Sequence, residues 1–321
     1  MRQPYISLLQ ILFFAIIASL VMTSCEDALV KDLDLEGDFD FEQRLGLSGT
    51  IVHQFDGDQD FQISGILLAE SQSIVNDPEE VVYYEGGELN LFRGSNLVGQ
   101  FQELGSGRYV GIDPNTSLGY VMPPDNYTME VEHPTLGMVS ATTTMPEPVY
   151  LTEVTADSID VPISEYSDLT PYLITLTFRD PPGKNFYGLQ VETKTQESDD
   201  FRIESYVSSV NNPNLIWLDS DLIVFSDEVF DDSEYTVSFY VELYNSYGGS
   251  LSSFTFEQIK SQLRIVWSCL SEDRYRFDVS HQNYILSTDL GPFSEPVTLY
   301  SNVENGLGYF GASNYYIAKF D

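Results

Sequence analysis

From residue 44 onward, hydrophobic and polar positions alternate with a period of two, and glycine, proline and asparagine separate the alternating stretches. Alternation at this period is typical of β-strands that bury one face, because successive side chains point to opposite sides of a sheet. Residues 44–53 and 61–68 flank the turn residues 56–58 and predict a hairpin. Further strands are expected at residues 88–93, 97–103, 108–112, 127–133 and 138–144. Short strands at this spacing predict a β-sandwich.

The second half of the chain continues the alternation and adds a helix. Residues 173–178 and 235–244 predict strands, and residues 263–270 are apolar enough for a central strand. Ser271 is a favourable N-cap, and the two acidic residues after it suit the first turn of a helix. We therefore expect one sizeable helix, over residues 272–286.

A boundary is expected between the two halves. Pro146 and Pro148 exclude a central strand there, because proline cannot donate a hydrogen bond to a sheet ladder. A chain of 321 residues is also long enough for two ordinary domains. We expect an N-terminal β-sandwich over residues 44–149 and a C-terminal β-rich domain over residues 150–321.

A glycine turn gives a first indication of the kind of sandwich. Residues 105–107 lead into a strand that carries Tyr109, and this arrangement resembles the prealbumin-like or carboxypeptidase-regulatory β-sandwich. The expected fold is therefore mostly β: an N-terminal immunoglobulin-like or prealbumin-like β-sandwich, followed by a second β-rich domain with one helix.

The first 25 residues have the layout of a bacterial signal peptide. Arg2 precedes an uncharged apolar core over residues 11–22, which is short for a membrane span of about 20 residues. Residues 20–25 resemble the lipobox, with small residues before Cys25 and Met22 where leucine is usual. The resemblance implies that residues 1–24 are removed and that Cys25 is lipidated, and several acyl chains would give stable attachment to a membrane. An uncleaved N-terminal anchor helix is the alternative.

An acidic segment follows Cys25. Residues 25–43 are expected to form a lipidated tether, since acidic residues alternate there with leucine, glycine and phenylalanine. This segment resembles the export signal of surface-exposed lipoproteins of the Bacteroidota, which implies an outer-membrane protein that is exposed at the cell surface. A solvated acidic linker is the alternative reading.

The net charge excludes one class of partner. The chain has 14 Lys and Arg residues against 50 Asp and Glu residues, a net charge of −36, and removal of residues 1–24 deletes only Arg2. Such a polyanion repels phosphate backbones, so we expect no nucleic-acid partner. Solubility of an exported protein accounts for most of this charge, and binding of a divalent cation or a basic partner stays open.

No pattern of catalytic residues stands out. Cys269 lies in an apolar stretch and is expected to be a buried thiol without a disulfide partner once Cys25 is acylated. The three histidines, His53, His133 and His281, are too far apart in the sequence for a local metal pair. The acidic residues 56–60 lack the glycine and glutamate of a calcium loop and are expected to form an acidic turn. We expect no enzyme activity, no cofactor and no metal.

The C-terminal region carries a family resemblance. Residues 293–311 are similar to the closing motif of the domain of unknown function 4249 family, lipoproteins of the Bacteroidota outer membrane. Looser matches lie at residues 44–49, 105–109, 178–181, 186–187 and 271–277. Gly46 stands where the family tends to have valine, and Tyr309 where isoleucine is usual. The resemblance implies no catalytic residue.

The same region has its own turn chemistry. Asn305 and Gly306 form a favoured type I′ pair, and Pro296 excludes a central strand at its position. A packed terminal hairpin is therefore expected, with a partner-facing loop as the alternative.

Two functions are expected from these patterns. The first is that of a non-catalytic outer-membrane lipoprotein, held in the membrane by lipid on Cys25, which docks as an accessory subunit on a TonB-dependent β-barrel transporter, as the family resemblance implies. The second is that of a surface glycan- or protein-binding module that acts without a transporter, for which the 21 tyrosines and 20 phenylalanines would supply stacking surfaces.

Overall fold

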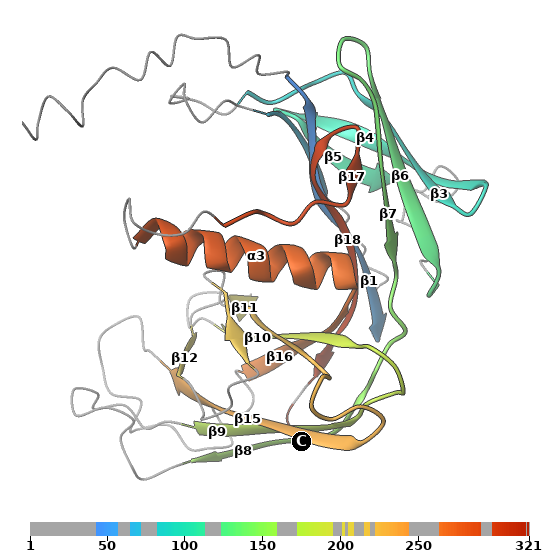
Figure 1. Cartoon of the computed structure of the whole chain (residues 1–321). Coiled ribbons are helices and arrows are strands. Elements are labelled where there is room, and N and C mark those ends of the chain that lie inside the picture. Colours follow the sequence, from blue (N-terminus) through green and yellow to red (C-terminus); the bar gives the residue numbers. More distant parts are fainter. Residues whose placement is uncertain are drawn as a thin grey trace, which may run out of the picture. The chain divides into compact units, whose positions relative to one another are not determined.

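The computed structural model describes residues 43–56, 65–71, 82–112, 123–158, 172–194, 201–202, 205–208, 215–218, 222–243, 263–289, 297–318 and 320 (Figure 1). These residues form β-strands and one helix, so the expected mostly β fold class is confirmed. The signal peptide, Cys25 and the acidic tether lie outside the described residues. Among the described helices, none is long and apolar enough to cross a membrane.

Strands from both ends of the chain form the first sandwich. They are β1 (Leu45–Asp56), β2 (Gly65–Glu70), β3 (Glu88–Arg93), β4 (Asn96–Gly105), β5 (Arg108–Ile112), β6 (Asn126–His133), β7 (Gly137–Thr144), β17 (Val303–Glu304) and β18 (Leu307–Ala318). Their order in the sheet is β18-β1-β2-β5-β4-β3-β6-β7-β17. Side chains at every second position fill one core, as the alternation predicts; they include Leu47, Leu68, Leu91, Met129 and Phe310. The expected strands over residues 88–144 are confirmed.

The second sandwich packs a separate sheet against the other end of the large one. The separate sheet has the order β12-β15-β9-β8, from Ser205–Ser208, Glu234–Leu243, Tyr172–Arg179 and Leu151–Ser158. The large sheet contributes β10 (Phe186–Lys194), β11 (Phe201–Arg202), β13 (Ile216–Trp217), β14 (Ile223–Ser226) and β16 (Leu263–Leu270). Trp267 lies fully buried in this core, with its ring centroid 4.9 Å from that of Phe178 and 5.3 Å from that of Tyr187.

The first and last strands of the body join the two sandwiches. β1 and β18 pair in parallel, in a register that runs from Gly46 opposite Leu307 to Asp56 opposite Tyr316. The start of β18 places Phe310 in the first core, and its end places Tyr316 in the second. The last strand therefore belongs to both sandwiches, whereas the domain boundary at residue 149 stays a prediction.

Residues 145–150 connect the two sandwiches without forming a strand, as their prolines predict. Side chains of β16 and β18 bind the backbone of this linker. The Trp267 indole donates to the carbonyl of Val149 at 2.9 Å, and the backbone N–H of Val149 donates to the Cys269 sulfur at 3.2 Å. The Asn314 amide donates to the carbonyl of Pro146. These bonds satisfy backbone groups of the linker that have no partner in a β-sheet.

The terminal segment differs from the expected hairpin. β17 pairs with β7, whereas β18 pairs with β1 and β16, so residues 305–306 turn a corner between layers. Only Asn305 of the pair has a positive φ, 60°, which excludes a type I′ turn. A Cβ on Gly306 would lie 2.6 Å from the carbonyl oxygen of Leu45. Glycine is needed there for close approach to β1, a tertiary contact that the local pattern does not reveal.

Helix α3 (Glu272–Asp289) confirms the helix expected from Ser271 and packs across β18 (Figure 1). The Ser271 hydroxyl accepts the N–H of Arg274 at 3.2 Å as an N-cap, and it also accepts the N–H of Ala312 in β18 at 2.9 Å. Phe277 stacks on Tyr309 with 3.7 Å between ring centroids. The helix is therefore fixed to the sheet at its first turn and along its first half.

Candidate functional site

The residues singled out in the sequence do not converge on one site in the described part of the chain. Cys25 and residues 57–60 of the acidic turn lie outside it. The Nδ1 of His53 contacts the amide oxygen of Asn314 at 2.8 Å, and His133 contacts Thr135. His281 lies on α3, where its ring stacks on that of Phe277.

Cys269 is buried, as expected. Burial raises the pKa of its thiol to about 12. A thiol with such a pKa is protonated at neutral pH and is a poor nucleophile, so Cys269 acts as a small core residue.

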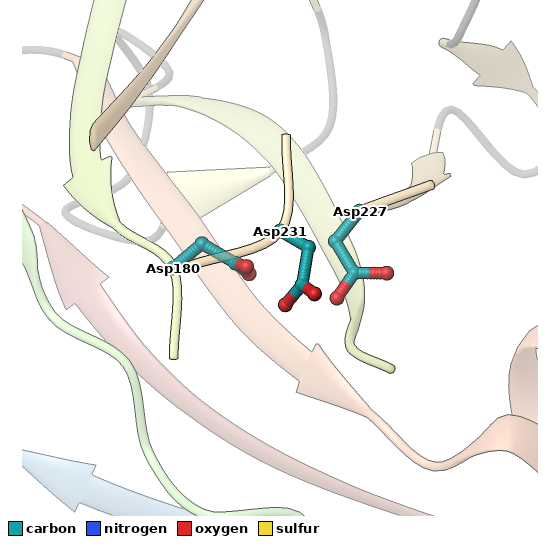
Figure 2. A group of neighbouring side chains, drawn as sticks. All are labelled: Asp180, Asp227 and Asp231. Atoms are coloured by element: carbon teal, nitrogen blue, oxygen red, sulfur yellow. The ribbon is translucent and has the colours of Figure 1, made fainter. Parts of the chain in front are cut away.

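A group of three carboxyl groups is the candidate cation site of the described residues. Asp180 follows β9, and Asp227 and Asp231 lie in the turn between β14 and β15. One oxygen from each residue lies within 4.8 Å of the others. Figure 2 shows the carboxyl group of Asp231 between those of Asp180 and Asp227 in this view. Asp180 and Asp227 are buried, whereas Asp231 is exposed.

Each of these carboxyl groups accepts hydrogen bonds from nearby backbone. Asp180 accepts the N–H of Asp232 at 3.1 Å and the hydroxyl hydrogen of Tyr187. Asp227 accepts the N–H of Asn185 at 2.7 Å, and Asp231 accepts the N–H of Gly183 at 2.9 Å. The last two bonds connect the turn after β14 to the proline-containing turn that follows β9.

Burial is the largest influence on the pKa values of Asp180 and Tyr187. It raises the pKa of Asp180 above its ordinary value, while the hydrogen bonds from Tyr187 and Asp232 lower it and the charges of Asp227 and Asp231 raise it. Burial also raises the pKa of the Tyr187 hydroxyl, and the hydrogen bond and charge of Asp180 add to this effect. Tyr187 is therefore a neutral donor to Asp180.

Two roles are chemically open to this cluster. Oxygen ligands of carboxylates are those that Ca²⁺ and Mg²⁺ prefer. The hydrogen bonds described above show instead that the carboxyl groups hold two turns together. We therefore assign the cluster a structural role. The cluster could not be predicted from local sequence, because Asp227 and Asp231 come from a turn far along the chain from Asp180 and no local motif marks them.

Comparisons with known proteins give the family. A search of the curated proteins finds no match. The biofilm associated protein BSP domain is similar over 86% of this chain and 59% of its own, at 8% identity and a TM-score of 0.23. A structure described as manganese lipoxygenase of Gaeumannomyces graminis and partial zonadhesin of Komagataella pastoris matches 70% of this chain and 88% of its own, at 7% identity and a TM-score of 0.16.

The family model described as "Domain of unknown function (DUF4249)" matches residues 35–317. This match covers both sandwiches, the linker and helix α3. The chain belongs to the domain of unknown function 4249 family.

Proposed function

We propose that this protein is a non-catalytic lipoprotein of the outer membrane, anchored by lipid on Cys25, that serves as an accessory subunit of an envelope complex. The observation that carries the proposal is the leader of residues 1–24, with its short apolar core and small residues directly before Cys25. Several acyl chains on one cysteine give an attachment that does not readily reverse. The acidic segment after Cys25 supports exposure at the cell surface.

The buried polar groups of the described residues support a non-catalytic role. Asp180, Asp227 and Asn314 are each bound to backbone groups that hold turns or the linker. Ser271 caps a helix and binds β18. Groups committed to the fold in this way are not arranged as a nucleophile with its base.

The proposed partner is a TonB-dependent β-barrel transporter. This part of the proposal is what the resemblance to outer-membrane lipoproteins of the family implies. The strongly negative body fits a protein partner better than an anionic surface, because a net charge of −36 repels anionic headgroups.

Two measurements test the proposal. Metabolic labelling with palmitate, followed by intact mass of the mature chain, should show acyl chains on Cys25, and a Cys25→Ala variant should leave the membrane fraction. Affinity capture of the native protein from solubilised outer membranes should recover a β-barrel. Recovery of the protein alone from several mild detergents would contradict the accessory role, and a mature chain that begins at another residue would contradict the anchor.

One observation favours the alternative, a glycan- or protein-binding module that acts alone. Tyr150 in the linker is 54% exposed, and its ring lies 5.0 Å from that of Phe55 in an edge-to-face arrangement. Exposed aromatic faces supply stacking surfaces for such ligands. Glycan-array binding that is lost in Tyr150→Ala and needs no barrel would favour this alternative, and an array without signal would count against it.

A further inference from the structure

Exposed apolar side chains gather at one end of the first sandwich. The strand pairings place at this end the start of β1, the end of β2, the β4–β5 turn, the β6–β7 turn and the corner between β17 and β18. We call it the apolar end and define it by the exposed side chains Val82, Tyr83, Leu104, Met138 and Leu307. At the opposite end of the same sandwich, the described residues expose Leu97 near the start of β4. Large apolar side chains are thus concentrated where β1 begins.

Leu104 lies at an irregularity near the end of β4, directly before a β4–β5 turn that is held by hydrogen bonds. Leu104 is 68% exposed, the largest exposed fraction among the large apolar side chains described. Residues 105–107 all have positive φ. The Ser106 N–H donates to the Glu85 carboxylate at 2.9 Å, and the carbonyl of Gly107 accepts the N–H of Leu68 at 2.8 Å. The turn is therefore held in a conformation that keeps a leucine out of the core.

The charged residues at the apolar end limit the kind of lipid surface that it can contact. Glu85 and Glu103 accept hydrogen bonds from the backbone N–H groups of Ser106 and Gly86, both at 2.9 Å, and so help to hold the β4–β5 turn and the segment before β3 in place. Among the described residues, the other charged groups at this end are Glu70, Glu88, Glu132, Glu304, Arg44 and Arg108. This excess of acidic groups is repelled by anionic headgroups, so the apolar end suits an electrically neutral lipid surface.

The position at which the tether enters the body indicates that the apolar end contacts a membrane. β1 begins at Leu45, so the tether joins the body at the apolar end. Residues 26–43 can span at most about 65 Å when fully extended, since each residue adds about 3.3–3.6 Å. A lipid on Cys25 therefore holds this end at a high effective concentration near the bilayer, where weak apolar contacts are sufficient for association.

We propose that the apolar end rests on an electrically neutral lipid surface, with Leu104, Met138 and Leu307 in the interfacial layer. Leucine and methionine contribute apolar area to such a contact, and tyrosine suits the boundary between headgroups and acyl chains. The inference rests on the proposed lipid anchor and adds an orientation to it: the second sandwich and helix α3 are left free for a protein partner.

The experiment uses the full lipidated protein in phosphatidylcholine vesicles. An environment-sensitive dye is attached through Leu104→Cys. Leu97→Cys is the matched control, since Leu97 is also an exposed leucine of β4, 51% exposed, at the opposite end of that strand. Cys269 is buried and does not compete for the dye. At position 104 we expect emission at shorter wavelength and a loss of intensity when spin-labelled lipid is added; at position 97 we expect neither. A second dye position, Leu307→Cys, should repeat the result of position 104.

Several results would overturn the inference. Acyl chains on Cys25 with no lipid quenching at position 104 would leave the anchor standing and remove the orientation. Equal quenching at positions 104 and 97 would show that the body has no preferred face. A dye at position 104 that is shielded but not quenched by lipid would assign the apolar end to a protein contact. A mature protein without lipid on Cys25 would overturn the anchor and the orientation together.

Discussion

Removal of the Ser271 hydroxyl is expected to destabilise the protein by two separable effects. In Ser271→Ala, helix α3 loses its N-cap bond to Arg274, which costs about 1 kcal/mol in the free energy of unfolding. The N–H of Ala312 in β18 also loses its acceptor, and a buried unsatisfied donor costs about 1–3 kcal/mol. The expected total is therefore about 2–4 kcal/mol.

Urea unfolding followed by circular dichroism measures this change, as a lower midpoint at an unchanged slope. Ser287→Ala is the control, because the Ser287 hydroxyl is exposed and donates to the carbonyl of Tyr284 within the same helix. Its effect should stay within about 0.5 kcal/mol. Ser271→Gly separates the two effects, since glycine as an N-cap costs only a few tenths of a kcal/mol. A Ser271→Ala variant as stable as Ser287→Ala, or a Ser271→Gly variant with full stability, would contradict the two losses assigned to the Ser271 hydroxyl.

Three further predictions follow from the geometry. The raised pKa of Asp180 means that the folded protein holds this proton more tightly than the unfolded chain, so the stabilisation it gives is present below the ordinary value of 3.8 and is lost as pH rises through the folded pKa. Asp180→Asn should flatten this part of the urea stability profile, and an unchanged profile would exclude Asp180 as its source. Gly308→Ala should lower stability by at least about 1–3 kcal/mol, because φ is 101° and a Cβ would lie 2.1 Å from the carbonyl oxygen of Leu47. Gly65→Ala, where a Cβ meets nothing within 4 Å, is the control, and equal melting temperatures of the two variants would contradict the parallel β1–β18 register. Cys269 should react with a thiol reagent only after unfolding, because burial raises its pKa to about 12; rapid labelling of the folded protein would contradict its burial.

Local sequence patterns were sufficient to place most strands and the helix. Residues 88–93, 108–112 and 263–270 form strands with the expected bounds, because their alternation or continuous apolar character is itself the property that a sheet selects. Ser271 marked the start of α3 for a similar reason: capping depends on a few neighbouring residues. The burial of Cys269 followed from the apolar residues around it.

The pairing of distant segments was not readable in the same way. Residues 305–306 have the composition of a hairpin turn, yet they form a corner, because Gly306 must pass close to Leu45 and β18 must reach β1. The cluster of Asp180, Asp227 and Asp231 was not predicted from the sequence, because its residues lie in two turns from separate parts of the chain. Neither arrangement leaves a periodic or local signal.

The sequence by itself determined the β class, the strand positions, the helix and its cap, and the family to which the chain is similar. It also carries the leader and Cys25 on which the proposed anchor depends. The tertiary structure alone decided that the first and last strands pair in parallel, that β18 contributes to both cores and that exposed apolar side chains gather where β1 begins. The physical reason is that side-chain periodicity fixes which face of a strand is buried, whereas the partner of a strand is set by long-range packing that no single stretch of sequence encodes.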